Sequence, residues 1–206
     1  MPTPRSRPRR AAALVGLTIG VAAAVVGCAP GGGATSDESI GIPPEIAERF
    51  DEIDAAVGGW SSAADLAEAQ RHAEAARNLV VGPDGPVYGD ATADGTVDGA
   101  TEVGLLPGLT GAAGLAQPPV NACVERDVLG GSWDDPQARW DGFDAVLASW
   151  RPDANTMPQL ASHPLRVVGW ATLTLEADTL DVARGYAGHA RLHVDISRSA
   201  YDACSS

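Results

Sequence analysis

The sequence predicts an all-α fold, an up-down bundle of four or five helices interrupted by one long loop. Apolar residues recur at helical spacing in several segments of residues 42–206. The inner positions of these segments are rich in alanine, which lets neighbouring helices pack closely. The helical pattern stops over residues 82–119, a stretch rich in Gly, Pro and Asp that is long enough to indicate a functional loop. We therefore expect tightly spaced helices and not a bulky aromatic core.

The first two helices precede this loop. We expect the first to start at Pro43 or Pro44, because proline lacks the N–H that the first helical turn leaves without a partner. The glycines at 58–59 should end it. Its apolar stripe consists of Ile46, Phe50, Ile53 and Val57. Ser62 is expected to cap the second helix, with Asp65 three residues later. The inner face of that helix consists of Leu66, Ala69, Ala73, Ala76 and Val80.

Helical patterns resume after the loop. The segment "PPVNACVERDVLGG" reads as a short helix, stopped by Gly130 and Gly131. A longer helix should start near Pro136, and one of its sides carries Trp140, Phe143, Leu147 and Trp150. The segment "SHPLRVVGWATLTLEA" has the β-branched residues typical of a strand, but the sequence offers it no second strand. We expect it to be a buried helix that starts near Pro164.

The final segment, residues 178–204, predicts one long amphipathic helix. Its polar arc consists of Asp181, Arg184, Arg191, Asp195, Arg198 and Asp202. Its inner arc consists of Val182, Ala183, Tyr186, Ala187, Ala190, Val194 and Tyr201, with Cys204 on the same side.

The N-terminus has the pattern of a secretory signal. Four arginines and no acidic residue precede an apolar run of 17 residues, Ala11 to Gly27. The run ends in "VVGC", Val25 to Cys28, which resembles the lipobox of bacterial lipoproteins. That resemblance implies cleavage before Cys28 and attachment of a lipid to its sulfur. The alternative is an ordinary signal peptide with an incidental cysteine.

The sequence after the signal predicts a tethered, acidic domain. Residues 1–27 would be the lipoprotein signal peptide, 28–41 a flexible tether rich in Gly, Ser and Thr, and 42–206 the helical domain. Cleavage would leave 10 of the 14 basic residues and all 27 acidic ones, a net charge of −17. Such a charge argues against nucleic acid as a partner. We expect the chain on the extracytoplasmic face of the cell membrane, which it contacts through the lipid anchor only.

The other two cysteines form an even pair. Cys123 and Cys204 would lie in an oxidising compartment, where a disulfide is favoured. The alternative is two separate buried thiols. A bridge would close a loop of about 80 residues and stabilise the fold by roughly 4 kcal/mol through the unfolded state.

The stretch "GDATADGTVDGATE", residues 89–102, carries the spacing of a calcium loop. With Asp90 as position 1, oxygen ligands and the sharp-turn glycine fall at the positions that an EF-hand loop requires. This order resembles the calcium loop of dockerin modules, although only one copy is present. The implied Ca²⁺ ligands are Asp90, Thr92, Asp94, Thr96 and Asp98, with Glu102 standing in for Thr101 at position 12. The alternative is a solvated turn cluster, since Asp and Gly favour turns.

The histidines offer a second candidate metal site. His189 and His193 are four residues apart, a spacing that places both rings on one side of a helix. His72 and Glu68, one turn earlier, could approach from another helix, as in bundle metal sites. The alternative is core histidines bonded to their neighbours. His163 precedes a proline and reads as a turn residue.

These patterns predict a lipid-anchored, extracytoplasmic binding or interaction protein without enzymatic activity, whose protein or small-molecule partner the sequence does not identify. No nucleophile elbow, phosphate-binding Gly-rich loop or "CxxC" motif is present. Two alternatives stay open: a bundle that binds a transition metal or haem through His72, His189 and His193, and a hydrolase without a recognisable motif.

Overall fold

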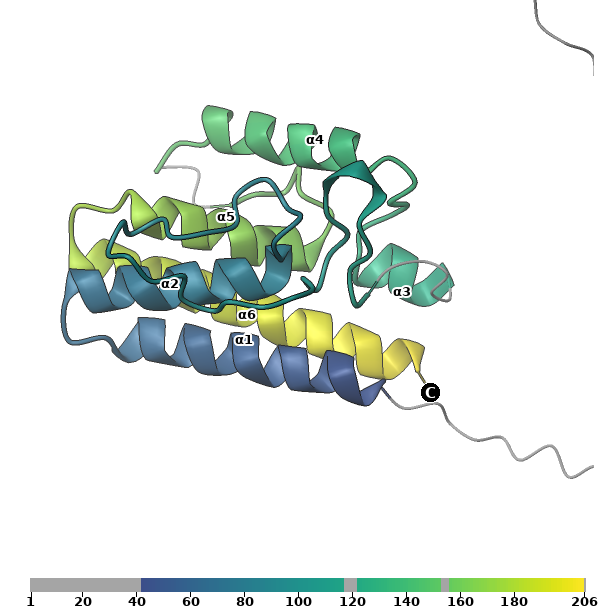
Figure 1. The fold of residues 1–206 in the computed structure, drawn as a ribbon, viewed down its shortest axis with the longest axis horizontal. Helices are drawn as coiled ribbons and strands as arrows, with labels where there is room; N and C mark the ends of the chain where they lie inside the picture. Colours follow the sequence, from purple (N-terminus) through teal and green to yellow (C-terminus); the bar gives the residue numbers. More distant parts are fainter. Residues whose placement is uncertain (1–41, 117–121, 153–155, 206) are drawn as a thin grey trace, which may run out of the picture. The chain divides into compact units, whose positions relative to one another are not determined.

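Four long helices that run alternately up and down make the body of the molecule (Figure 1). They are α1 (Pro44–Ser62), α2 (Leu66–Val81), α5 (His163–Leu175) and α6 (Leu180–Cys204). The computed structural model describes residues 42–116, 122–152 and 156–205. Helix α1 packs on α2 and α6, and α5 packs on the same two helices. The predicted all-α bundle is confirmed, and the described residues contain no strand.

Three further elements of the described residues lie outside this four-helix body. They are a 3₁₀ turn, η1 (Leu109–Gly111), and the helices α3 (Ala122–Asp127) and α4 (Pro136–Ser149). Helix α4 lies beside α5 and contacts η1, while α3 contacts α6 (Figure 1). The predicted signal peptide, the tether and Cys28 fall outside the described residues, as do residues 117–119 of the loop.

The boundary between α1 and α2 differs from the sequence prediction. Helix α1 continues through Gly58 and Gly59 to Ser62. A Cβ atom at Gly59 would collide with the ring of His72, so this glycine lets α2 approach and does not end the helix. Ser62 is not the cap of α2, because its hydroxyl donates to the Gly58 carbonyl at 2.9 Å. Asp65 is the cap instead, and it accepts the N–H of the third helical residue at 2.8 Å.

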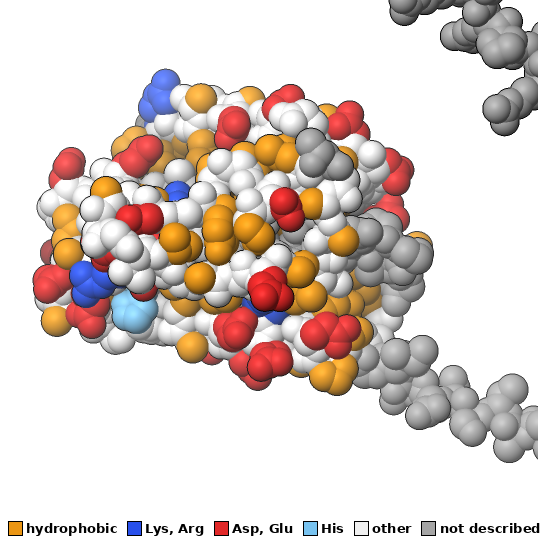
Figure 2. Space-filling model, in the orientation of Figure 1, with side chains coloured by type: hydrophobic (Ala, Val, Ile, Leu, Met, Phe, Trp, Pro, Cys, Tyr) orange, Lys and Arg blue, Asp and Glu red, His pale blue; other side chains and the backbone are white. Residues whose placement is uncertain are grey.

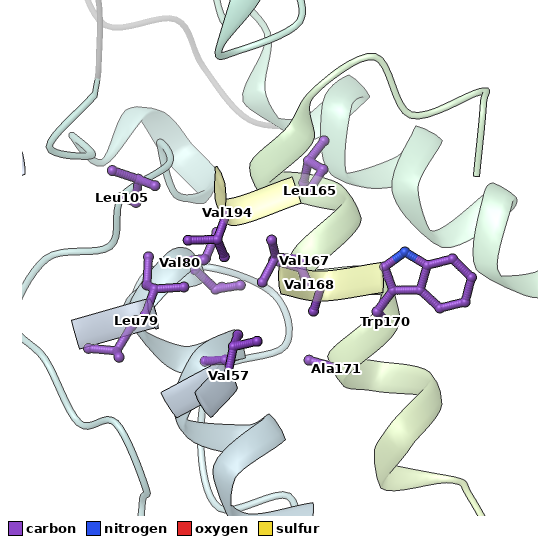
Figure 3. Close-up of a cluster of buried hydrophobic side chains, with 14 of the residues drawn as sticks. Val57, Leu79, Val80, Leu105, Leu165, Val167, Val168, Trp170, Ala171 and Val194 are labelled. Atoms are coloured by element: carbon purple, nitrogen blue, oxygen red, sulfur yellow. The ribbon is translucent and has the colours of Figure 1, made fainter. Parts of the chain in front are cut away.

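Helix α5 confirms the expectation of a buried helix. It starts at His163, with Pro164 in its first turn and the Ser162 hydroxyl accepting the Leu165 N–H at 3.4 Å. His163 is therefore its first helical residue and not part of a turn. Helices α2 and α6 pack on α5, whose Val167 and Val168 are almost completely buried, and Figure 3 shows valines of all four helices close together. This burial explains how the helix can carry two valines and two threonines, residue types that favour strands.

Helix α6 has the inner face that was predicted, with one exception. Ala183, Ala187 and Ala190 are fully buried, but Val182 is 43% exposed. The arginines of its polar arc are not simply solvated. Arg191 pairs with Asp54 of α1, and Arg198 pairs with another α1 carboxylate at 2.6 Å. The polar arc therefore lies beside α1, where its arginines add ion pairs to the apolar contact between α1 and α6.

The core is more aromatic than the alanine content predicts. Small residues do line the seams between helices, but five aromatic rings are also almost completely buried: Phe50, Trp60, Trp140, Phe143 and Trp170. Trp60 donates its indole N–H to the Ala183 carbonyl at 2.8 Å. The expectation of a core without bulky aromatic residues was wrong, because large rings fill the spaces beyond the close helix contacts.

Cys123 and Cys204 form a disulfide, as predicted. It joins α3 to the last turn of α6, and the two positions are 81 residues apart in the sequence. The bond fixes a short helix that otherwise has few contacts of its own. By the chain-entropy model, a loop of this length corresponds to roughly 4 kcal/mol of stabilisation.

Candidate functional site: the acidic loop on helix α2

The loop after α2 folds back along the same helix (Figure 1). The backbone N–H groups of Leu105 and Leu106 donate to the carbonyls of Leu79 and Val80, at 3.2 and 3.0 Å. Both leucine side chains are almost completely buried. The loop thus satisfies carbonyl groups that the end of a helix leaves open, and it forms part of the core.

A buried carboxylate holds the acidic part of the loop. Glu74 of α2 is 0% exposed. One of its oxygens accepts the N–H of Ala91 at 2.7 Å and of Thr92 at 2.9 Å, and the other accepts the N–H of Asp98 at 3.0 Å. Three N–H donors compensate the cost of burying this charge.

Asn78, one turn after Glu74, holds the same segment at two further points. Its side-chain amide donates to the carbonyls of Gly89 and Asp98, at 3.1 and 2.8 Å, and accepts the Gly89 N–H at 3.1 Å. Neither Glu74 nor Asn78 was predicted as part of the site. Glu74 directly follows the inner-face position Ala73, which could indicate that it is buried but not what it binds, and Asn78 follows Arg77 and carries no such signal.

The loop turns through hydrogen bonds from its own backbone to its own carboxylates. Asp90 accepts the N–H of Asp94 at 3.2 Å and of Gly95 at 2.8 Å. Asp94 accepts the N–H of Thr96 at 2.9 Å. Gly95 has a φ of 91°, a conformation that favours glycine and that a sharp turn requires. Asp90, Asp94 and Gly95 are thus part of one tight turn.

The predicted ligands do not all come together. Thr92 lies beside Asp90, with its hydroxyl 3.5 Å from one carboxylate oxygen. Glu102 instead lines a surface groove with the α1 residues Glu45, Glu48 and Glu52. Within the described residues, just one group of three potential ligands gathers within 4.8 Å, namely Cys123, Asp127 and Cys204, and its cysteines form the disulfide.

Asp98 has the most unusual environment of the loop acids. Its Oδ2 atom is shielded from solvent and contacts no hydrogen-bond donor. Burial raises the pKa of its carboxyl group, and the nearby carboxylates of Glu74 and Asp94 raise it further. Arg71 and His72 act in the opposite direction and lower it, so the negative charge of Asp98 is compensated in part, while its Oδ2 has no hydrogen-bond donor among the described residues.

Arg49 ties the far end of the loop to α1. Its guanidinium donates to the carbonyls of Leu79 and Val103, at 2.9 and 2.6 Å, and to the hydroxyl of Thr101 at 2.7 Å. It also pairs with Glu52 at 2.8 Å. Thr101 is therefore part of the anchor of the loop.

The residues of the alternative histidine site have separate surroundings. Glu68 accepts the Ala64 N–H at 2.6 Å as part of the start of α2, and His72 lies against Gly59. His189 stacks on Trp170 with ring centroids 4.5 Å apart. In the described part of the chain, no histidine belongs to a group of three or more His, Cys, Asp or Glu side chains that lie close enough together to bind one metal ion.

His193 forms a hydrogen bond with His163, a residue that the sequence pattern did not indicate as part of a site. Its Nδ1 lies 3.0 Å from Nδ1 of His163, so one ring donates and the other accepts. Burial lowers the pKa of His193 to about 4, and the nearby Arg166, His163 and His189 contribute. The pair joins the start of α5 to the middle of α6 as a neutral contact.

No family model, curated protein sequence or solved structure matches this chain.

None of the helices among the described residues combines the length and apolar character needed to cross a membrane. The charge of the visible face fits the composition, with many more acidic than basic side chains (Figure 2).

Proposed function

We propose that this protein is a lipid-anchored, extracytoplasmic binding protein without enzymatic activity, and that residues 89–102 hold a calcium ion. The lipobox-like "VVGC" ending at Cys28 supports the anchor. The disulfide between Cys123 and Cys204 is compatible with an oxidising compartment outside the cytoplasm. The observation that carries the calcium proposal is the environment of Asp98.

Asp98 favours a cation for an electrostatic reason. Its carboxylate lies close enough to Glu74 and Asp94 for both to raise its pKa, and one of its oxygens has no donor. A divalent cation would relieve this repulsion and supply the missing partner. Calcium is preferred because it takes carboxylate, hydroxyl and backbone carbonyl oxygens in flexible geometry.

The loop would supply these oxygens from alternate positions, and its carboxylates would have to move closer together, because they do not gather within 4.8 Å in the described residues. Asp90, Asp94 and Asp98 offer carboxylates, Thr92 a hydroxyl and Thr96 its carbonyl. Glu102 would have to leave its place on the groove beside α1 to take part. Because position 12 offers no carboxylate, we expect an extracellular type of affinity, on the order of 10⁻⁴ M.

A calcium titration of the melting temperature tests the proposal. Calcium at about 100 times the dissociation constant should raise the free energy of unfolding by roughly 2.7 kcal/mol. Asp94→Ala should abolish most of this gain. Asp144→Ala, an exposed position on α4, is the matched control and should keep it. Asp54 would be a poor control, because it pairs with Arg191.

Two results would contradict the calcium proposal. One is a melting temperature that does not change when calcium reaches the millimolar range. The other is an equal increase in the Asp94→Ala variant, which would place the ion elsewhere. In either case residues 89–102 would be a structural loop held by Glu74 and Asn78.

A further inference from the structure

Helix α6 carries a second row of apolar and small residues, on the side that faces away from the bundle. We call this row the outer strip. Its members are three or four residues apart in alternation, which is the spacing of the contact residues in coiled-coil helices. The outer strip consists of Val182, Gly185, His189, Leu192 and Ile196. A surface helix ordinarily carries charged and polar residues on its outward side, so packing within the bundle does not account for the strip.

The outer strip is open to solvent at its largest side chains. Leu192 is 52% exposed and Val182 is 43% exposed. Among the described residues just three large apolar side chains are exposed, and these are two of them. The opposite side of α6, which includes Ala183, Ala187 and Ala190, is fully buried. Helix α6 therefore has two apolar sides, and the bundle covers only one of them.

The neighbouring helix α1 shows the usual arrangement. Its exposed side carries Glu45, Glu48 and Glu52, and its apolar residues Phe50 and Ile53 are buried. The two helices pack against each other in the same bundle. Exposed apolar residues at regular spacing are therefore a property of α6 and not of the bundle surface in general.

Two glycines on the exposed side of α6 have no role in packing within the chain. Glycine inside a helix costs about 1 kcal/mol relative to alanine. A Cβ atom at Gly185 or Gly188 would meet no atom within 4 Å, so neither glycine makes room for another part of the protein. The distance between packed helices depends on the side chains at their contact, and glycine permits a close approach. A second helix against the outer strip would make use of both glycines.

The border of the outer strip is negative. Asp181 and Asp195 are exposed beside it. The arginines of α6 are used on another side: Arg184 donates to the carbonyl of the residue that ends α1 at 2.7 Å, and Arg191 and Arg198 pair with α1 carboxylates. The chain as a whole has 27 acidic and 14 basic residues, so a second copy would bring like net charges together. A basic partner fits this border better than another copy of the chain.

We propose that the outer strip binds an amphipathic helix of another protein, one that carries lysine or arginine beside its apolar residues. The apolar residues of that helix would pack beside Leu192 and over Gly185, as in other contacts between paired helices. Its cations would lie near Asp181 and Asp195, where complementary charge sets the orientation and speeds association. The strip is separate from the calcium loop, and this proposal does not depend on calcium binding.

Fluorescence anisotropy with a labelled peptide tests the proposal. The probe is a helical peptide of about three heptads with leucine at positions a and d and lysine at e and g. Its counterpart carries glutamate in place of lysine. The full chain in phosphatidylcholine nanodiscs should bind the lysine peptide with a dissociation constant on the order of 10 µM, after subtraction of the signal of empty nanodiscs. The glutamate peptide should bind about tenfold more weakly or less.

Two variants of the strip and one matched control complete the test. Leu192→Asn should weaken binding about tenfold, because it removes the main apolar group of the contact. Gly185→Gln should have a similar effect by holding the two helices apart. Gly142→Gln should bind normally, since Gly142 is also an exposed helical glycine with an open Cβ position but belongs to α4. All three positions are exposed, so the variants should keep the native circular dichroism spectrum.

Several results would overturn the proposal. They are equal binding of the lysine and glutamate peptides, unchanged binding in Leu192→Asn, an equal loss in Gly142→Gln, and no binding at about 1 mM peptide. Analytical ultracentrifugation adds one more. Dimers of the protein itself that Leu192→Asn dissociates would assign the strip to a second copy of the chain.

Discussion

Glu74 is one of two α2 side chains, with Asn78, that hold the acidic loop in place. Its carboxylate accepts three loop N–H groups from a position with no exposed surface. Hydrogen bonds to a buried charge contribute more than neutral ones, and a buried donor without a partner costs about 1–3 kcal/mol. The loop therefore depends on one residue of α2 more than on any residue of its own.

Glu74→Gln should destabilise the protein by about 3 kcal/mol. The substitution replaces one accepting oxygen with an amide nitrogen, which would face loop N–H groups and leave them without an acceptor. Chemical unfolding measures the loss, and hydrogen exchange should become faster at Ala91, Thr92 and Asp98. Glu48→Gln, at an exposed position of α1, is the control. Equal stability of the two variants would show that Glu74 does not anchor the loop.

The pair of His163 and His193 should make stability depend on pH. The folded pKa of His193 is about 4, below the ordinary value of 6.5, so the unfolded chain binds a proton more readily. The stability is therefore complete above about pH 6.5 and falls as the pH drops toward 4. The difference corresponds to about 3 kcal/mol.

Urea unfolding at about pH 7, 6 and 5 measures this dependence. Carboxylates also titrate at the acid end, so the informative comparison is with His193→Gln, which removes the titrating ring. The variant should lose much less stability than the native chain between about pH 7 and pH 5. Parallel curves for the two proteins would exclude His193 as the cause.

At the scale of elements, small residues set the spacing between helices. Gly59 of α1 faces the ring of His72 on α2, and a side chain there would collide with it. Gly185 of α6 is also helical, but it is exposed and has no neighbour within 4 Å of a Cβ position. These two glycines therefore separate the effect of helix contact from that of helix propensity.

Gly59→Ala should destabilise the bundle by about 1–3 kcal/mol, because the new methyl group forces α2 or His72 to move. Gly185→Ala should stabilise it by up to about 1 kcal/mol, the usual gain when alanine replaces glycine inside a helix. Thermal unfolding compares them directly. Stabilisation by Gly59→Ala would mean that α1 and α2 are not packed at this position.

The sequence was sufficient for the helices and insufficient for their contacts. Apolar stripes such as Phe50 and Ile53 predicted which faces are buried, because that signal is local. The glycines at 58–59 were read as a helix end, although tertiary packing on His72 keeps them helical. The role of Glu74 as anchor of the loop was missed for the same reason. Glu74 accepts hydrogen bonds from residues 17 to 24 positions away, and no local sequence pattern indicates such contacts.

At the scale of the whole molecule, charge, disulfide and tether fit one arrangement. The mature domain would carry a net charge of −17 and would be joined to its lipid by a polar segment, residues 28–41. An acidic body is repelled by anionic lipid surfaces, so a polar segment between the lipid and the helical domain would let this domain stand away from the membrane. The proposed calcium loop would then be open to the extracytoplasmic solvent.

The mass of the N-terminal peptide of the exported protein tests this account most directly. We predict that protein extracted from the membrane starts at Cys28 and carries a diacylglycerol group on its sulfur. In the Cys28→Ala variant, the precursor should stay uncleaved and without lipid. A native chain that retains residues 1–27, or one that starts with an unmodified Cys28 or at another residue, would contradict the lipid anchor.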